Sequence, residues 1–135
     1  MDCIFCKIIS KQISAKILHE TPNSISFMDA FPLVKGHVLV IPKIHHQKIQ
    51  EMSSDENSDL FSLVHTMMSK VDSISGSTLV AIHNGEDAGQ EIPHIHVHLV
   101  PRSNSDSAGP IHSMFNSSLQ LSDVEIEKYY NMLKI

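Results

Sequence analysis

The chain has 135 residues and a mass of 15.1 kDa, a length typical of one domain that folds around its own core without disulfide staples. Hydrophobic residues make up 41% and charged residues 19% of the chain, the composition of an ordinary globular protein. No apolar run approaches the roughly 18 residues that a membrane span needs. A net charge of −5 without a dense basic patch argues against nucleic-acid binding.

The N-terminal segment predicts a short helix or turn over residues 3–10, with Cys3 and Cys6 one turn apart. Residues 1–4 contain no basic stretch leading into an apolar one, so we expect no secretory signal. Two cysteines at Cys-x-x-Cys spacing cannot form a disulfide framework. They indicate metal or redox chemistry in a reducing compartment, and a cytoplasmic location is expected.

Two strands are predicted next, over residues 24–29 and 37–41, joined by a hairpin connection over residues 30–36. Residues 53–56 (SSDE) match a capping box and open a run of apolar residues at helical spacing. This pattern predicts a long amphipathic helix that ends near residues 73–76.

The second half of the chain predicts a strand over residues 78–83, a turn over 84–89 and a histidine-containing strand over 91–100. A second capping box at residues 122–125 opens a terminal helix. Together these elements predict an α+β domain, an antiparallel meander of about five strands with one long helix packed on it.

Three of the ten histidines, His94, His96 and His98, alternate with aliphatic residues. In a strand, this period of two places all three imidazoles on one face. Such an array is typical of a catalytic metal site. It is equally typical of a phosphate site, where one imidazole attacks phosphorus and its neighbours donate hydrogen bonds. The spacing alone leaves both alternatives open.

The neighbouring segments favour the phosphate site. Gly85, Gly89 and Gln90 belong to a turn whose backbone N–H groups can approach an anion closely. Upstream, Phe27 and Asp29 end a predicted strand with apolar surface and then a carboxylate. This combination can receive a nucleoside, with the apolar surface for the base and the acid for the ribose hydroxyls.

Residues 93–102 (PHIHVHLVPR) resemble the signature of the histidine triad (HIT) family, His-φ-His-φ-His-φ-φ, where φ is hydrophobic. Residues 36–45 (GHVLVIPKIH), residues 88–90 (AGQ) and Asp29 match further segments of that family. The resemblance implies a nucleotide hydrolase or transferase that cleaves a nucleoside 5′-phosphate from its leaving group through a nucleotidyl-histidine intermediate. His37 matches a family position without an assigned role.

The resemblance also implies a domain organisation and an assembly. It predicts a HIT domain over residues 1–102 and a C-terminal helical extension over residues 103–135, packed on the same domain. It further implies a homodimer, with the strand at residues 78–83 and the long helix as the interface.

In site roles, the resemblance makes His96 the nucleophile. His98 would contact the non-bridging phosphate oxygens, together with backbone N–H groups of Gly89, Gln90 and Glu91. The nucleoside would be bound by Asp29 at the ribose and, at the base, by Ile4, Phe5, Ile8, Phe27, Leu39 and Ile41. The expected substrate is a purine nucleotide, an AMP derivative, and no catalytic metal is expected.

A structural zinc is implied as well, held by Cys3, Cys6, His45 and His94. Two sulfurs and two nitrogens are typical of closed tetrahedral zinc sites. The first histidine of the triad would then serve the metal and the other two catalysis. A redox dithiol is the alternative for the cysteine pair.

Two residues depart from the family pattern. His83 stands where Asn or Gln is common beside the scissile phosphate, and Glu91 stands where Ser or Thr is common. An inward Glu91 carboxylate would repel an anionic leaving group, so either it turns away or the leaving group is cationic. The second alternative predicts a preference for amine leaving groups, such as a lysine phosphoramidate. The departures also leave open an alternative function, a zinc-stabilised nucleotide-binding or sensing module with little turnover.

Overall fold

A computed structural model describes residues 2–115 and 119–135. The chain divides into two units, Met1–Ser105 and Asp106–Ile135. The first unit holds the sheet and its helices. The second holds a 3-10 helix, Ile111–Met114, and α3, Asp123–Leu133. Ser122 caps α3 as its capping box predicts, whereas the packing of the C-terminal extension on the domain stays a prediction.

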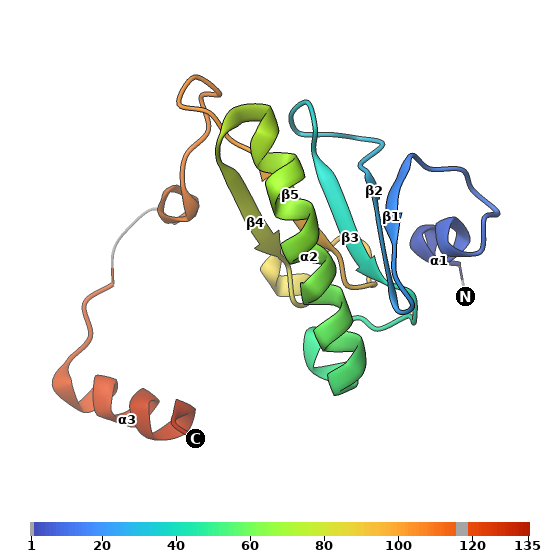
Figure 1. Ribbon diagram of the computed structural model, residues 1–135. Coiled ribbons are helices and arrows are strands. Elements are labelled where there is room, and N and C mark those ends of the chain that lie inside the picture. Colours follow the sequence, from blue (N-terminus) through green and yellow to red (C-terminus); the bar gives the residue numbers. More distant parts are fainter. Residues whose placement is uncertain (1, 116–118) are drawn as a thin grey trace. The chain divides into compact units, whose positions relative to one another are not determined.

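The expected antiparallel five-stranded sheet is confirmed (Figure 1). Its order is β1-β2-β3-β5-β4, and every neighbouring pair is antiparallel. The order departs from a simple meander, because the chain passes to the far edge as β4 and returns as β5 beside β3. The strands are β1 (Ile17–Glu20), β2 (Ser24–Met28), β3 (Val38–Pro42), β4 (Thr78–Ile82) and β5 (Val97–Pro101).

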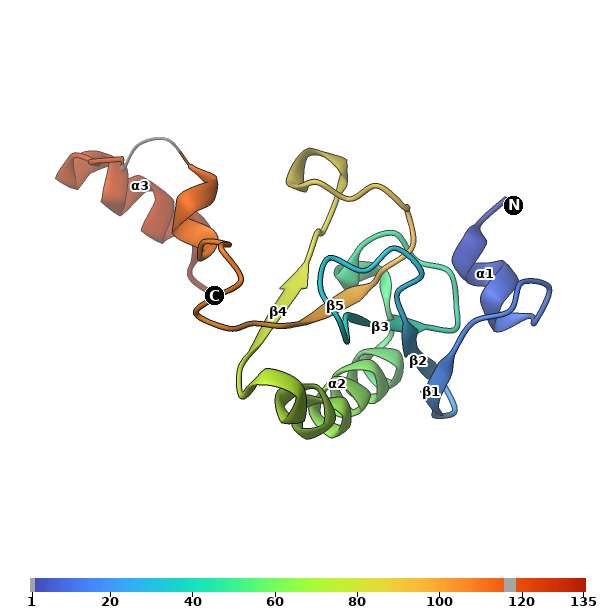
Figure 2. The same cartoon turned by 90° about the horizontal axis from the view of Figure 1, so that it is seen from above.

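Helix α2 (Ser54–Ser75) is the predicted long helix and lies along one face of the sheet (Figure 2). The Ser53 side chain accepts a hydrogen bond from the Glu56 N–H, and Gly76 ends the helix at φ +88°. A side chain is strained at that φ, which suits glycine. No helix in the described part of the chain has the length and apolar character needed to cross a bilayer.

The two faces of β3 separate two apolar clusters, as the alternation of a strand requires. Val38 and Val40 pack beneath α2 with the buried side of that helix. Leu39 and Ile41 point the other way, into a cluster that includes Phe5 of α1 (Ile4–Ile9). The sheet therefore holds a helix-covered core on one face and the short N-terminal helix on the other.

The predicted histidine strand is wrong in its first half. The prediction spans residues 91–100, whereas β5 begins at Val97. The His94 N–H donates to the Ile92 carbonyl in a tight turn, and the Ile95 N–H donates to the His46 carbonyl, outside the sheet. Because these amides bond elsewhere, His94 leaves the strand face on which His98 stands.

Candidate active site and metal centre

A cavity of about 330 Å³ opens on the α1 side of the sheet. That volume falls within the range of small-molecule sites. Most of the side chains expected from the sequence line it: Ile4, Phe5, Ile8, Phe27, Asp29, Leu39, His83, Gly89, Glu91, His96 and His98. The lining also includes residues that sequence reasoning missed, namely Ala30, Phe31, Leu33, His37 and Ile92.

Two predicted contacts lie outside this lining. Ile41 is fully buried in the apolar cluster beneath the cavity. The Gln90 side chain accepts from the Gly85 N–H at 2.9 Å and donates to the Gln47 carbonyl at 2.9 Å. Both ends of this amide are therefore occupied in holding the 83–91 loop in place.

His96 is oriented by a backbone carbonyl. Its Nδ1 lies 2.7 Å from the His94 carbonyl oxygen. A carbonyl only accepts, so Nδ1 carries the proton and Nε2 keeps a free lone pair. Burial lowers the pKa of His96 below its ordinary value. The ring is therefore neutral near pH 7, as a nucleophile must be.

A hydrogen-bond relay sets the tautomer of His98. The Leu33 N–H donates to His37 Nδ1 at 3.1 Å, so the proton of His37 sits on Nε2. That Nε2 lies 3.0 Å from His98 Nδ1 and donates to it. His98 must then carry its own proton on Nε2. Burial, followed by neighbouring imidazoles, lowers the pKa of His98 to about 4, so His98 is a neutral N–H donor.

The same relay argues against a metal ion shared by Asp29, His37 and His98. Their ligand atoms lie within 4.8 Å of one another, close enough to share a cation. A metal on His37 Nε2 would require that nitrogen to lose its proton, which the Leu33 bond places there. The geometry thus favours a proton between the two imidazoles. Asp29 Oδ1 accepts the Phe31 N–H at 2.9 Å.

The 83–91 loop places His83 and Gly89 together. Gly89 has φ +103°, and a Cβ there would lie 3.3 Å from His83 Cδ2. Among the expected phosphate donors, the Gly89 and Gln90 amides already donate to carbonyls of the loop's own 3-10 turn. These two N–H groups are engaged within the turn, and the contact of all three N–H groups with phosphate stays a prediction. The Glu91 N–H has no such bond among the described residues.

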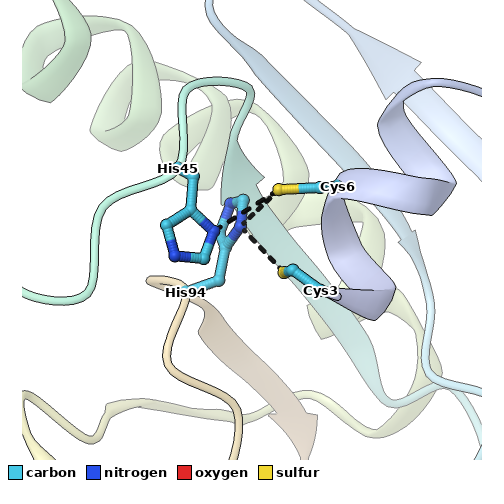
Figure 3. Close-up of side chains that lie close together, drawn as sticks. All are labelled: Cys3, Cys6, His45 and His94. Carbon is cyan, nitrogen blue, oxygen red and sulfur yellow. Dashed lines mark hydrogen bonds between the residues drawn. The ribbon is translucent and has the colours of Figure 1, made fainter. Parts of the chain in front are cut away.

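The predicted zinc ligands Cys3, Cys6, His45 and His94 meet in one cluster (Figure 3). Cys3 Sγ lies 3.5 Å and Cys6 Sγ lies 3.7 Å from His94 Nδ1, and Cys6 Sγ lies 3.4 Å from His45 Nδ1. Around a tetrahedral zinc, ordinary Zn–S and Zn–N bonds place sulfur and nitrogen about 3.6 Å apart. The observed distances bracket that value.

The tautomer of His94 suits a metal ligand. His94 Nε2 lies 2.9 Å from the Pro42 carbonyl oxygen, so Nε2 carries the proton and Nδ1 offers its lone pair to the cluster. Ligating histidines commonly donate their other N–H in this way. The residues present therefore fit a zinc ion.

The comparisons agree with this geometry. A family model described as "HIT domain" matches residues 10–105. The chain belongs to the HIT family. It is 39% identical over 106 residues to an uncharacterised HIT-like protein of Methanocaldococcus jannaschii, covering 77% of this chain and 81% of that one. It is 38% identical over 106 residues to an adenosine 5′-monophosphoramidase of Schizosaccharomyces pombe, covering 78% of each.

Solved structures of HIT proteins show the same fold. A hypothetical protein from Leishmania major matches with a TM-score of 0.84 at 32% identity, over 97% of this chain and 92% of that one. A zinc-bound histidine triad family protein from Mycobacterium smegmatis matches with a TM-score of 0.68 at 32% identity, over 79% of each chain. The HIT fold predicted from the sequence is thus confirmed.

The missed HIT site residues differ in the signal that the sequence carried. His37 stands in the recognisable segment of residues 36–45, but its partner His98 lies 61 residues away. Phe31 and Leu33 stand in the hairpin connection, at 85% and 75% exposure. In the sequence, their only signal is that they are apolar residues in a connection predicted to be a turn.

Proposed function

We propose that the chain is a nucleotidyl hydrolase that releases a nucleoside 5′-monophosphate, AMP, from a phosphoramidate or phosphoanhydride through a covalent intermediate on His96. The observation that carries this proposal is the pair of fixed tautomers in the cavity. His96 presents a lone pair and His98 presents an N–H, which are the two functions that phosphoryl transfer needs at one phosphorus.

In the proposed reaction, His96 Nε2 attacks the α-phosphorus and the bond to the leaving group breaks. The leaving group takes up a proton from solvent as it departs, and the water that attacks in the second step returns one to solvent. Water then cleaves the phosphorus–nitrogen bond, which releases the monophosphate and restores the neutral imidazole. Charge develops on the non-bridging oxygens in both steps, where the His98 N–H and the Glu91 backbone N–H are suitable donors.

The nucleoside would lie along the apolar wall of the cavity. Asp29 keeps Oδ1 bonded to the Phe31 N–H, and Oδ2, 3.6 Å from His37 Nε2, would accept hydrogen bonds from the ribose hydroxyls. Ile4, Phe5 and Phe27 offer flat and branched surfaces to a purine. The pocket contributes this apolar surface for binding, and the histidines contribute the chemistry.

Glu91 gives the proposed substrate preference. Its carboxylate is exposed at the cavity that also contains His83 and His98. A negative charge there repels an anionic leaving group and attracts a cationic one. We infer that the enzyme prefers an amine leaving group, as in a lysine phosphoramidate, over a dinucleoside polyphosphate.

The adduct itself is the direct test. The full-length protein is mixed with adenosine 5′-phosphoramidate, quenched in base and measured by intact mass, with His96→Gln and the exposed His65→Gln as matched variants. We expect one adenylyl group on the parent and on His65→Gln, and none on His96→Gln. AMP binding without adduct or turnover would instead support the zinc-stabilised binding module.

The proposal also includes a structural zinc, a cytoplasmic location and a homodimer. Zinc in the cysteine–histidine cluster is structural, and cysteines without a disulfide, as Cys3 and Cys6 are, are typical of the reducing cytoplasm. The chain forms a homodimer through β4, an edge strand whose Leu79 and Val80 are 39% and 42% exposed. An unpaired apolar edge is a ready template for a second strand. Sedimentation of the zinc-loaded protein as a single 15.1 kDa species would refute the dimer.

A further inference from the structure

Residues 3–9 contribute to both the metal cluster and the cavity. Cys3 precedes α1 and Cys6 lies within it, and both belong to the cluster. Ile4, Phe5 and Ile8, on the same turns of chain, line the cavity. One short segment therefore supplies two of the four metal ligands and one wall of the nucleotide site.

Helix α1 has little stability of its own. It has six residues, and its N-cap Cys3 makes no side-chain capping bond. Isolated helices shorter than about 12 residues are marginal in water. Its position must come from tertiary contacts. These are the packing of Phe5 and Ile8 on the sheet and the thiols that face His45 and His94.

The cluster also adjoins the reacting histidine. The Phe5 ring lies edge-on to His94, at 5.7 Å, and to His96, at 5.1 Å between centroids. The His94 carbonyl holds His96 Nδ1 at 2.7 Å. Release of the His94 ring from the cluster would free both the Phe5 wall and the carbonyl that orients His96.

The main core contains no residue of α1. The cluster beneath α2 contains residues of β3, β5 and α2, together with Met52 and Ile95, and none of residues 3–9. Loss of the metal should therefore loosen α1 while α2 and the sheet stay folded. We propose that the metal held by Cys3, Cys6, His45 and His94 fixes α1 as a wall of the cavity, so that nucleotide affinity depends on metal loading.

This inference rests on the proposed nucleotide site and adds a metal dependence to it. Binding of the metal and binding of the nucleotide are then coupled, and each strengthens the other. The coupling distinguishes this arrangement from a metal that stabilises the whole domain uniformly, which would lower the stability of α2 and α1 alike.

The experiment compares zinc-loaded, chelator-stripped and zinc-restored full-length protein. Zinc content is measured by atomic emission, AMP affinity by calorimetry, and local opening by amide hydrogen exchange. We expect exchange of residues 3–9 to rise at least tenfold on stripping, with α2 unchanged. We expect the AMP Kd to rise at least tenfold, which corresponds to about 1.4 kcal/mol, and to return when zinc is restored.

Two variants distinguish the effect of losing the metal from the effect of shortening the apolar wall of the cavity. His45→Ala removes a ligand that does not line the cavity, and the exposed His65→Ala is its matched control. Ile4→Ala shortens the wall and keeps every ligand. We expect His45→Ala to lose zinc and AMP affinity together, His65→Ala to keep both, and Ile4→Ala to lose AMP affinity with zinc retained. In the double variant that combines His45→Ala with Ile4→Ala, the loss of AMP binding free energy should be smaller than the sum of the two single losses.

The outcomes that overturn the inference are distinct from failure of the proposed function. Equal AMP affinity in loaded and stripped protein, with zinc bound and lost as measured, overturns the coupling alone. Simultaneous exchange of α1 and α2 on stripping overturns the local role of the metal. Zinc-loaded protein that binds no AMP overturns the proposed function, and this inference with it.

Discussion

His37 offers the sharpest test of the site chemistry. His37→Asn keeps an acceptor near the Leu33 N–H but is too short to donate to His98, which His37 Nε2 reaches at 3.0 Å. A buried neutral hydrogen bond contributes about 0.5–1.5 kcal/mol. Its loss changes the tautomer ratio of His98 by roughly two- to tenfold. Complete loss of one transition-state donor costs about 10²- to 10³-fold in kcat.

We therefore expect His37→Asn to lower kcat by up to about tenfold, with KM little changed, and His98→Asn to lower it by at least about 10²-fold. The relay predicts that the double variant is no slower than His98→Asn, since His37 donates its Nε2 proton to His98. The assay is single-turnover hydrolysis of adenosine 5′-phosphoramidate. The ¹⁵N imidazole shifts of His98 should report a protonated Nε2 in the parent and mixed tautomers in His37→Asn. Additive losses in the double variant would refute the relay.

Three other changes test neighbouring features. Gly89→Ala should lower unfolding free energy by about 1–3 kcal/mol because of its positive φ and should slow turnover through His83. Gly76→Ala, equally strained but with nothing within 4 Å of the new Cβ, should lose stability alone. Glu91→Ser should raise turnover of a dinucleoside polyphosphate relative to a lysine phosphoramidate by up to about tenfold. An unchanged ratio of the two turnover rates would contradict the leaving-group proposal. Because burial lowers the pKa of His96, its reactive neutral form persists as the pH falls. Adduct formation at pH 6 should thus retain more than the roughly one quarter of its pH 8 rate that an ordinary histidine keeps, and a larger loss counts against a buried nucleophile.

Local patterns in the sequence were sufficient for most of the fold. The capping boxes predicted where α2 and α3 begin, and two short segments rich in apolar residues, joined by a turn-like connection, predicted β2 and β3. Strand β1 was not predicted, because all four of its residues are exposed and form no pattern of alternating burial. It forms as the edge partner of β2, with Ile17 opposite Phe27. A solvent-exposed edge strand carries little apolar alternation, so its pairing is a tertiary effect.

The histidine motif shows where a local pattern stops being sufficient. The alternation of histidine with aliphatic residues correctly grouped His96 and His98 at the cavity. It placed His94 with them, because nothing within residues 91–100 reveals that the Ile95 amide bonds the His46 carbonyl. That bond pulls the segment away from the sheet and aims His94 at cysteines 88 and 91 residues earlier in the chain. The resemblance to the HIT family supplied that long-range pairing, which spacing alone could not.

The electrostatics follow from burial rather than from net charge. The chain carries −5 overall, yet it is proposed to bind a phosphate. Burial lowers the pKa values of His37, His96 and His98, so the three rings are neutral near pH 7. In the proposed reaction they act on phosphate through fixed N–H groups and a lone pair, not through positive charge. The Glu91 carboxylate is a formal charge at the same cavity. In the proposed reaction, this single exposed carboxylate therefore influences which leaving group is accepted.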